Sequence, residues 1–210
     1  GVSVGTTTAL SGGTYVVSSS VLADGSYDIT ATADDGVSGV SDPSSALALT
    51  IDTVAPNVPG VPDLSSASDS GTADTDDLTN DTTPTLAGTS EAGINVELTS
   101  DEDGLVGTAS ADGAGNWLIT TSALSEDDHS LTATAKDIAG NTSTASAALV
   151  VTIDATSPAA PAIPDLATAS DTGNDSDNIT SDDTPTINGT AEADTSIELL
   201  SGSTSLGTTT

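Results

Sequence analysis

The sequence predicts an all-β protein made of repeated β-sandwich domains, and three observations support this. A block of about 100 residues recurs along the chain. Each block alternates short runs of apolar or β-branched residues with turns rich in Asp, Gly and Asn. No segment keeps an apolar period of about 3.6 residues for long enough to form a helix.

The internal repeat aligns without gaps over long stretches. Residues 106–137 match residues 4–35, and residues 151–173 match residues 49–71, both at an offset of 102. After a one-residue deletion, residues 184–200 match residues 83–99 at an offset of 101. A period of this length indicates that each repeat is a domain-sized unit.

The expected strands follow in order through the period that lies between residues 53 and 154. They are TPTLAGT (83–89), INVELTS (94–100), GLVGTAS (104–110), NWLITTS (116–122), HSLTATA (129–135) and ASAALVVTI (145–153). The turn sequences DEDG, ADGAGN and DIAGN separate them. About seven short strands in about 100 residues are typical of an immunoglobulin-like sandwich. The expected core, chosen by strand periodicity, consists of Leu86, Val96, Leu98, Ile119, Leu131 and either Val150 or Val151.

Proline-rich stretches mark the domain boundaries. Each follows a strand-like segment that ends in IDTVAP (51–56) or IDATSP (153–158), and proline cannot lie in a central strand. The predicted organisation is the C-terminal half of one repeat (1–52), a complete repeat (53–154) and the N-terminal half of a third (155–210). We therefore expect a slice of a longer tandem array.

The charge balance restricts the possible partners. The chain has 32 Asp and Glu residues against one Lys or Arg, and its formal charge is −31. Such a surface excludes nucleic acids and anionic membranes and favours cations or basic surfaces. The chain has no cysteine, and it has no apolar run long enough to span a membrane.

A combination of short motifs resembles a known family. The motifs TIDTVAP, SASDSG, TNDTTPTLAGTSEAG, ADGAGNW and LTATAKDIAGNTS are similar to the bacterial Ig-like repeats of giant surface adhesins, which include biofilm-associated proteins and RTX-type adhesins exported by type I secretion. The resemblance implies a secreted, cell-surface or extracellular stalk of many repeats, stiffened by Ca²⁺. It also implies that the partners of each repeat are its neighbours in the same long chain.

Three carboxylates from separate segments are expected at each domain junction. In this type of sandwich the B–C and F–G loops gather where the chain enters the domain. Glu91 lies in the B–C loop and Asp137 in the F–G loop, so both are expected beside Asp52, which ends the last strand of the preceding domain. Carboxylates, main-chain carbonyls and water are the ligands of Ca²⁺, which takes about six to eight oxygens. The corresponding residues elsewhere in the chain are Asp154, Glu192 and either Asp34 or Asp35.

A second acidic cluster lies in the expected A–B loop. The stretch SDSGTADTDDLTND (68–81) recurs as SDTGNDSDNITSDD (170–183), within a connection of about eighteen residues that is expected to lack strands. A bound cation would order such a loop, although neither stretch matches the EF-hand pattern. The alternative is a solvated acidic loop that keeps the protein soluble. The candidate ligands are Asp69, Asp74, Asp76, Asp77, Asp81, Asp171, Asp175, Asp177, Asp182 and Asp183.

Nothing in the sequence predicts an enzyme. The triplets at 69–71 and 171–173 match the Asp-[Ser/Thr]-Gly motif of aspartic proteases but lack its apolar flanks. His129 aligns with Tyr27 and is expected at the surface, and the chain has no second His for a zinc site. Trp117 is expected to cover the edge of a small core rather than to stack on a sugar.

The sequence therefore predicts a structural extender of an extracellular adhesin or filament, with Ca²⁺ at its domain junctions. Two alternatives stay open at this point. The sandwich loops could bind a carbohydrate or a host protein. The half-domains could also be completed by neighbouring chains of a filament or biofilm matrix.

Overall fold

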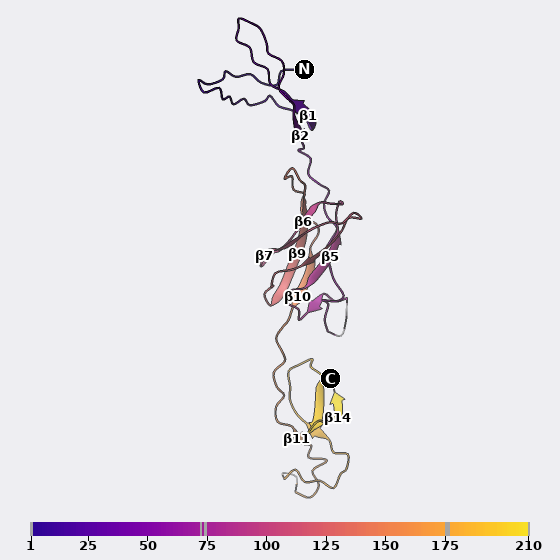
Figure 1. The fold of residues 1–210 in the computed structure, drawn as a ribbon. Coiled ribbons are helices and arrows are strands. Elements are labelled where there is room, and N and C mark those ends of the chain that lie inside the picture. Colours follow the sequence, from indigo (N-terminus) through magenta and orange to yellow (C-terminus); the bar gives the residue numbers. More distant parts are fainter. Residues whose placement is uncertain (1, 72, 74, 175–176, 210) are drawn as a thin grey trace. The chain divides into compact units, whose positions relative to one another are not determined.

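The computed structural model divides the chain into two units, Gly1–Asp154 and Ala155–Thr210. The structure describes residues 2–71, 73, 75–174 and 177–209. Within these ranges every regular element is a β-strand (Figure 1). The predicted all-β class is therefore confirmed, whereas the tandem array and the domain boundaries stay predictions.

Residues 53–154, called here the central domain, form a sandwich of two sheets. The larger sheet has the order β4 (Leu78–Thr79), β10 (Leu149–Ile153), β9 (Asp127–Lys136), β6 (Asn95–Ser100) and β7 (Gly104–Ser110). The smaller sheet has the order β3 (Asp63–Leu64), β5 (Thr85–Thr89) and β8 (Asn116–Thr120). Within the described residues of these sheets the pairings are antiparallel, except that β4 runs parallel to β10.

The core lies between the two sheets because every second residue of each strand turns inward. In β6 the side chains of Val96 and Leu98 are fully buried, whereas Glu97 between them is partly exposed. Burial of a side chain the size of Leu98 contributes roughly 1.5–3 kcal/mol. The predicted core is confirmed, and the choice left open in β10 falls on Val151, which is 0% exposed against 52% for Val150.

Trp117 packs in this core and not at its edge. Its side chain is 2% exposed, and its ring lies directly over Gly88 on the paired strand β5. A Cβ atom built on Gly88 would overlap the indole ring. Glycine therefore makes room for the only tryptophan of the chain.

Six strands of the central domain, β5 to β10, overlap the six segments predicted from sequence. The two short strands β3 and β4 were not predicted. The expectation that the A–B connection lacks strands is wrong at Leu78 and Thr79, which form β4. The main-chain N–H groups of Thr152 and Asp154 donate to the carbonyl oxygens of Asp77 and Thr79, each at 2.9 Å. These hydrogen bonds hold this part of the connection against β10.

Residues 2–52 contain one hairpin, formed by β1 (Gly25–Ile29) and β2 (Leu47–Ile51). Gly25 pairs with Ile51 and Ile29 pairs with Leu47. Their counterparts in the central domain, at the offset of 102, make the same pairs between β9 and β10. The repeat found in the sequence is thus also a repeat of strand register.

The second unit repeats two other pairings of the central domain. The pair β11 (Asp165–Leu166) and β12 (Ile187–Asn188) has the register of β3 and β5. The pair β13 (Ile197–Ser201) and β14 (Thr204–Thr209) has the register of β6 and β7, including an irregularity after Leu199 that corresponds to the one after Leu98.

Candidate functional site

The turn that contains Glu91 lies at the end of the central domain called here the linker end. The main-chain N–H of Ser90 donates to the carbonyl of Gly115 at 2.8 Å, so the B–C turn contacts the turn that precedes β8. Glu91 Oε1 accepts two hydrogen bonds from Asn57, one from the main-chain N at 2.8 Å and one from Nδ2 at 2.6 Å. Glu91 therefore clamps the proline-rich segment that leads into the domain.

Asp137 organises the F–G turn at the same end. Its Oδ1 accepts from the main-chain N of Asn141 at 2.8 Å, and its Oδ2 accepts from Asn141 Nδ2 at 2.9 Å. The hydrogen bond from the Asn141 side chain is the largest cause of a lowered pKa of the Asp137 carboxyl. Asn141 Nδ2 also donates to the carbonyl oxygen of Asp52 at 3.0 Å.

The Asn141 amide group thus links the F–G turn to the chain that precedes the domain. Two oxygens, Asp137 Oδ2 and Asp52 O, lie within hydrogen-bond distance of a single nitrogen. The carboxylate of Asp52 itself accepts from the N–H of Val54 at 3.1 Å. Sequence reasoning missed Asn57 and Asn141. Asn141 could have been found from the sequence, because it follows Asp137 by four residues within a turn and both residue types form hydrogen bonds in turns.

The described part of the chain contains no group of three or more His, Cys, Asp or Glu side chains arranged to hold a metal ion. The structure brings Asp137 and Asp52 together through Asn141, and it places Glu91 on Asn57. The Ca²⁺ site expected from these carboxylates stays a prediction.

The corresponding acidic residues elsewhere are engaged in local hydrogen bonds. In the first copy, Asp34 Oδ1 accepts from the N–H of Gly36 at 2.8 Å. The N–H groups of Val37 and Ser38 bind Asp35 Oδ1, and the bond from Ser38 is the first cause of a lowered pKa of that carboxyl. In the second unit, Glu192 Oε2 accepts from the N–H of Ala159 at 3.0 Å, in the same way that Glu91 holds Asn57.

Several acids of the A–B loops cap turns in both copies of the repeat. Asp81 Oδ1 accepts from the main-chain N of Thr83 at 2.9 Å, and Asp182 Oδ1 accepts from that of Thr184 at 3.0 Å. Asp76 and Asp177 bind the N–H two residues further on. Two of the predicted ligands, Asp74 and Asp175, lie outside the described residues.

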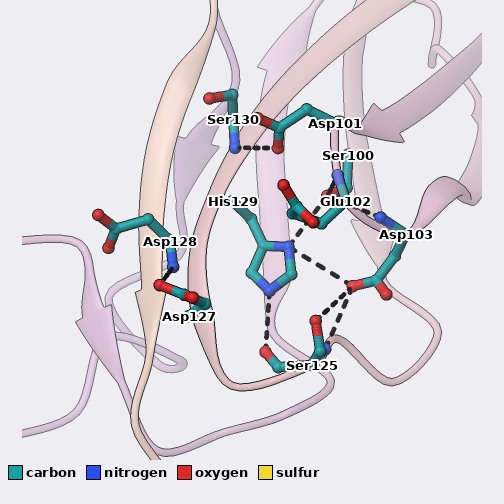
Figure 2. Close-up of polar contacts among 9 residues, drawn as sticks. All are labelled: Ser100, Asp101, Glu102, Asp103, Ser125, Asp127, Asp128, His129 and Ser130. Carbon is teal, nitrogen blue, oxygen red and sulfur yellow. Dashed lines mark hydrogen bonds and ion pairs between the residues drawn. The ribbon is translucent and has the colours of Figure 1, made fainter.

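The expectation that His129 lies at the surface is wrong. Its side chain is fully buried at the other end of the central domain, called here the distal end. Figure 2 shows the ring between the turn that follows β6 and the segment that precedes β9. Nδ1 lies 3.0 Å from Ser100 Oγ and 3.5 Å from Asp103 Oδ2, and Nε2 lies 2.8 Å from the carbonyl oxygen of Ser125. Because a carbonyl only accepts, Nε2 carries a proton.

The hydrogen bond from His129 to Ser125 has a counterpart in the first copy of the repeat. There the hydroxyl of Tyr27 donates to the carbonyl of Ala23 at 2.8 Å, also four residues upstream. This contact resembles the tyrosine corner of immunoglobulin-like domains, where a Tyr near the start of strand F bonds to the backbone upstream. In the central domain His129 takes that role. The alignment of His129 with Tyr27 could have predicted this shared role from the sequence.

Ser100, His129 and Asp103 do not form a catalytic triad. In a triad the imidazole removes the proton of an exposed serine hydroxyl with one nitrogen and donates to a carboxylate with the other. Here Nε2 is bound to a main-chain carbonyl, and the ring has no solvent exposure. Ser100 Oγ also accepts from the N–H groups of Glu102 and Asp103. The cluster ties two loops together and presents no nucleophile.

The comparisons with known proteins agree with this geometry. Residues 55–155 match a family model described as "Bacterial Ig-like domain". The central domain is therefore similar in sequence to a bacterial Ig-like domain over almost its whole length. The match agrees with the predicted Ig-like repeat of an adhesin over the central domain.

Among solved structures, one similar chain is described as "Biofilm associated protein - BSP domain". The two share 22% sequence identity with a TM-score of 0.33, and the match covers 73% of this chain and 23% of the other. A search of curated proteins finds no significant match. Across the described residues no helix is long and apolar enough to cross a membrane.

Proposed function

We propose that this chain is a run of spacer repeats from a bacterial extracellular adhesin or filament, in which Ca²⁺ at the linker end stiffens the connection between successive domains. The family match over residues 55–155 supports the repeat. The observation that carries the proposal is the Asn141 amide, which joins the F–G turn of the central domain to the chain before it.

The side chains at the linker end suit a hard cation. Asp52, Glu91 and Asp137 would hold the ion, and the oxygens available there are carboxylate and main-chain oxygens, which Ca²⁺ prefers. When bound, the ion would supply positive charge between segments that otherwise repel each other. The repulsion is large because the chain has a formal charge of −31 and only one Lys or Arg.

The alternative of a carbohydrate-binding module finds no support at Trp117. Sugar recognition of that kind uses an exposed aromatic side chain, whereas Trp117 is buried in the core. The partners that we propose are therefore neighbouring repeats of the same long chain, at the bacterial cell surface or outside the cell.

Removal of Ca²⁺ from the full chain tests the proposal. Chelation is expected to lower the melting temperature and to change the maximum dimension seen by small-angle X-ray scattering. Binding to the folded state alone stabilises it by about 2.7 kcal/mol at a hundredfold excess of ligand over Kd. The Asp137→Asn variant should lose the change in dimension, because a charged ligand at the junction is removed.

Asp112→Asn is the matched control for Asp137→Asn. Asp112 lies in a turn at the same end and accepts hydrogen bonds from the N–H groups of Ala114 and Asn116. These bonds stabilise only the turn that contains Asp112. The control should respond to Ca²⁺ like the parent chain. A maximum dimension that chelation does not change, or an equal loss in both variants, would contradict the proposal.

A further inference from the structure

The first and last strands of the central domain belong to different sheets. β3 lies in the smaller sheet, and β10 lies in the larger one. The chain enters at the linker end, where Asn141 binds the carbonyl of Asp52, and it leaves at the distal end, where Ile153 pairs with Asp127. A pull on the two ends of the domain therefore runs along the strands and passes from one sheet to the other.

The strand β4 connects the A–B loop to the last strand. It runs parallel to β10. The main-chain N–H groups of Thr152 and Asp154 donate to the carbonyl oxygens of Asp77 and Thr79, each at 2.9 Å. Because the hydrogen bonds between strands run across the strand direction, a pull along β10 loads these bonds together and not one after another. Tension on β10 is thus transmitted to the A–B loop.

The side chain of Thr79 ties β4 to the beginning of the same loop. It is 1% exposed, and its hydroxyl donates to the carbonyl oxygen of Ser68, eleven residues earlier in the chain. The main-chain N–H of Asp81 donates to the same Oγ1 at 3.0 Å. A hydrogen bond that is shielded from water is electrostatically stronger than one in water. This bond therefore keeps the loop from extending between Ser68 and Thr79.

Ser68 continues the connection to the smaller sheet. Its Oγ accepts from the main-chain N–H of Thr85 on β5 at 3.0 Å and donates to Asp81 Oδ2 at 3.2 Å. Ser68 and Thr79, with the bonds from β10 to β4, are called here the sheet latch, because they join the two sheets. In the second unit three of these hydrogen bonds recur among the equivalent residues Ser170, Thr180, Asp182 and Thr186.

We propose that the sheet latch bears tension along the chain and that the hydroxyl of Thr79 determines its resistance. The need for such a device rests on the proposed function, because a spacer is pulled along its length. When the latch is closed, the sheets separate only after the bonds of β4 and Thr79 break. When it is open, the loop extends, and the pull acts on the pairs β3–β5 and β9–β10 alone.

Single-molecule stretching of the full chain at constant force tests the proposal. Unfolding of the central domain is recognised by a length gain on the order of 30 nm, since about 100 residues extend by about 3.3–3.6 Å each. Thr79→Val keeps the shape of the side chain and removes its hydroxyl. Its unfolding rate under force should be about tenfold higher than that of the parent, the factor that corresponds to one lost hydrogen bond.

Three further variants separate the latch from a general loss of stability. Ile119→Val removes a buried methylene group from β8, outside the latch, and chemical denaturation should show an equilibrium loss similar to that of Thr79→Val. Its unfolding rate under force should stay within about twofold of the parent, because the core stays packed until the latch opens. Thr79→Ser keeps the hydroxyl and should also stay near the parent. Ser68→Ala removes the other hydroxyl of the latch and should act like Thr79→Val.

The proposal would be overturned if Thr79→Val and Ile119→Val accelerated forced unfolding equally, or if Thr79→Ser unfolded as fast as Thr79→Val. An unchanged rate in Ser68→Ala would contradict it in the same way. All of these measurements are made in chelator, so they do not depend on the junction ion. Failure of the latch and failure of the proposed Ca²⁺ junction are therefore distinguishable.

Discussion

The central domain and residues 2–52 share one sequence pattern, yet equivalent apolar side chains are buried in the central domain and exposed in residues 2–52. Trp117 is 2% exposed, whereas Tyr15 at the equivalent position is 55% exposed. Ile119 is 3% exposed, and its counterpart Val17 is 43% exposed. In the central domain both residues lie on β8, which pairs with β5. Residues 2–24 form no strand in the described part of the first copy.

The difference shows which pairings depend on distant partners. Residues 2–52 align with residues 104–154, so the segments that correspond to β5 and β6 are not among them. β7 pairs with β6 and β8 pairs with β5, and the equivalents of β7 and β8 are the strands that do not form. The hairpin β1–β2 keeps the register of β9–β10, because both of its strands lie within the segment.

The largest expected effect comes from truncating a core residue in each copy. Leu131→Ala removes a fully buried side chain from the central domain and should cost about 2–5 kcal/mol of unfolding free energy. Ile29→Ala changes the equivalent residue of β1, which is only partly buried, and should leave the main melting transition unchanged. Chemical denaturation of both variants measures the difference, and equal losses would show that the first copy has a core of its own.

A glycine pair sharpens the same comparison. Gly88→Ala places a methyl group against the Trp117 ring and should cost about 1–3 kcal/mol. Gly189→Ala changes the equivalent position of the second unit, where nothing lies within 4 Å of the added atom. Its effect should stay within about 0.5 kcal/mol. Thermal melting of the two variants measures these costs. Similar losses of stability in both would argue that the second unit is packed like the central domain.

Substitution of His129 tests the hydrogen bond between this residue and the carbonyl of Ser125 at the distal end. His129→Ala removes the buried donor to Ser125 and leaves that carbonyl unpaired, so about 1–3 kcal/mol should be lost. His129→Tyr introduces the residue that makes this contact in the first copy and should recover a large part of the loss. Denaturant titration of both variants gives the comparison. If His129→Tyr is as unstable as His129→Ala, the equivalence with Tyr27 is wrong.

The smallest effect concerns acid sensitivity at the linker end. The N–H groups of Asn116 and Ala114 lower the pKa of the Asp112 carboxyl below its ordinary value of 3.8. Its ionised form therefore stabilises the fold above that pH, and the contribution disappears as pH falls through the lowered pKa. Asp112→Asn keeps the turn acceptor, so parent and variant should differ slightly near neutral pH and converge in acid. Melting temperatures followed with pH would test this convergence.

Much of the fold could be predicted because the alternation of apolar residues marks each strand and the offset of the repeat fixes the domain length. The strands β3 and β4 escaped prediction because they contain two residues each and show no period. β4 forms through hydrogen bonds from β10, a long-range contact that local sequence does not encode.

The polar sites were harder to predict than the core. Acidic residues were assigned to loops correctly, but their partners are amides and main-chain groups that composition does not single out, such as Asn57 and Asn141. Burial of Asp69 and His129 was missed because Asp is usually exposed and His is only intermediate in its tendency to be buried. The copies of the repeat held the missing information, since Asp171 and Tyr27 occupy the equivalent positions.

Hydrogen exchange along the full chain tests the central claim most directly, namely that strands form where both sheets of the sandwich are present. Exchange should be slowest in β6, β9 and β10 of the central domain, intermediate in the hairpin β1–β2, and fast in residues 2–24. The central domain and its partial copies would then differ although their sequences correspond. Equally slow exchange in residues 14–20 and in their counterparts 116–122 would contradict the account, because residues 14–20 would then be as ordered as β8 of the central domain.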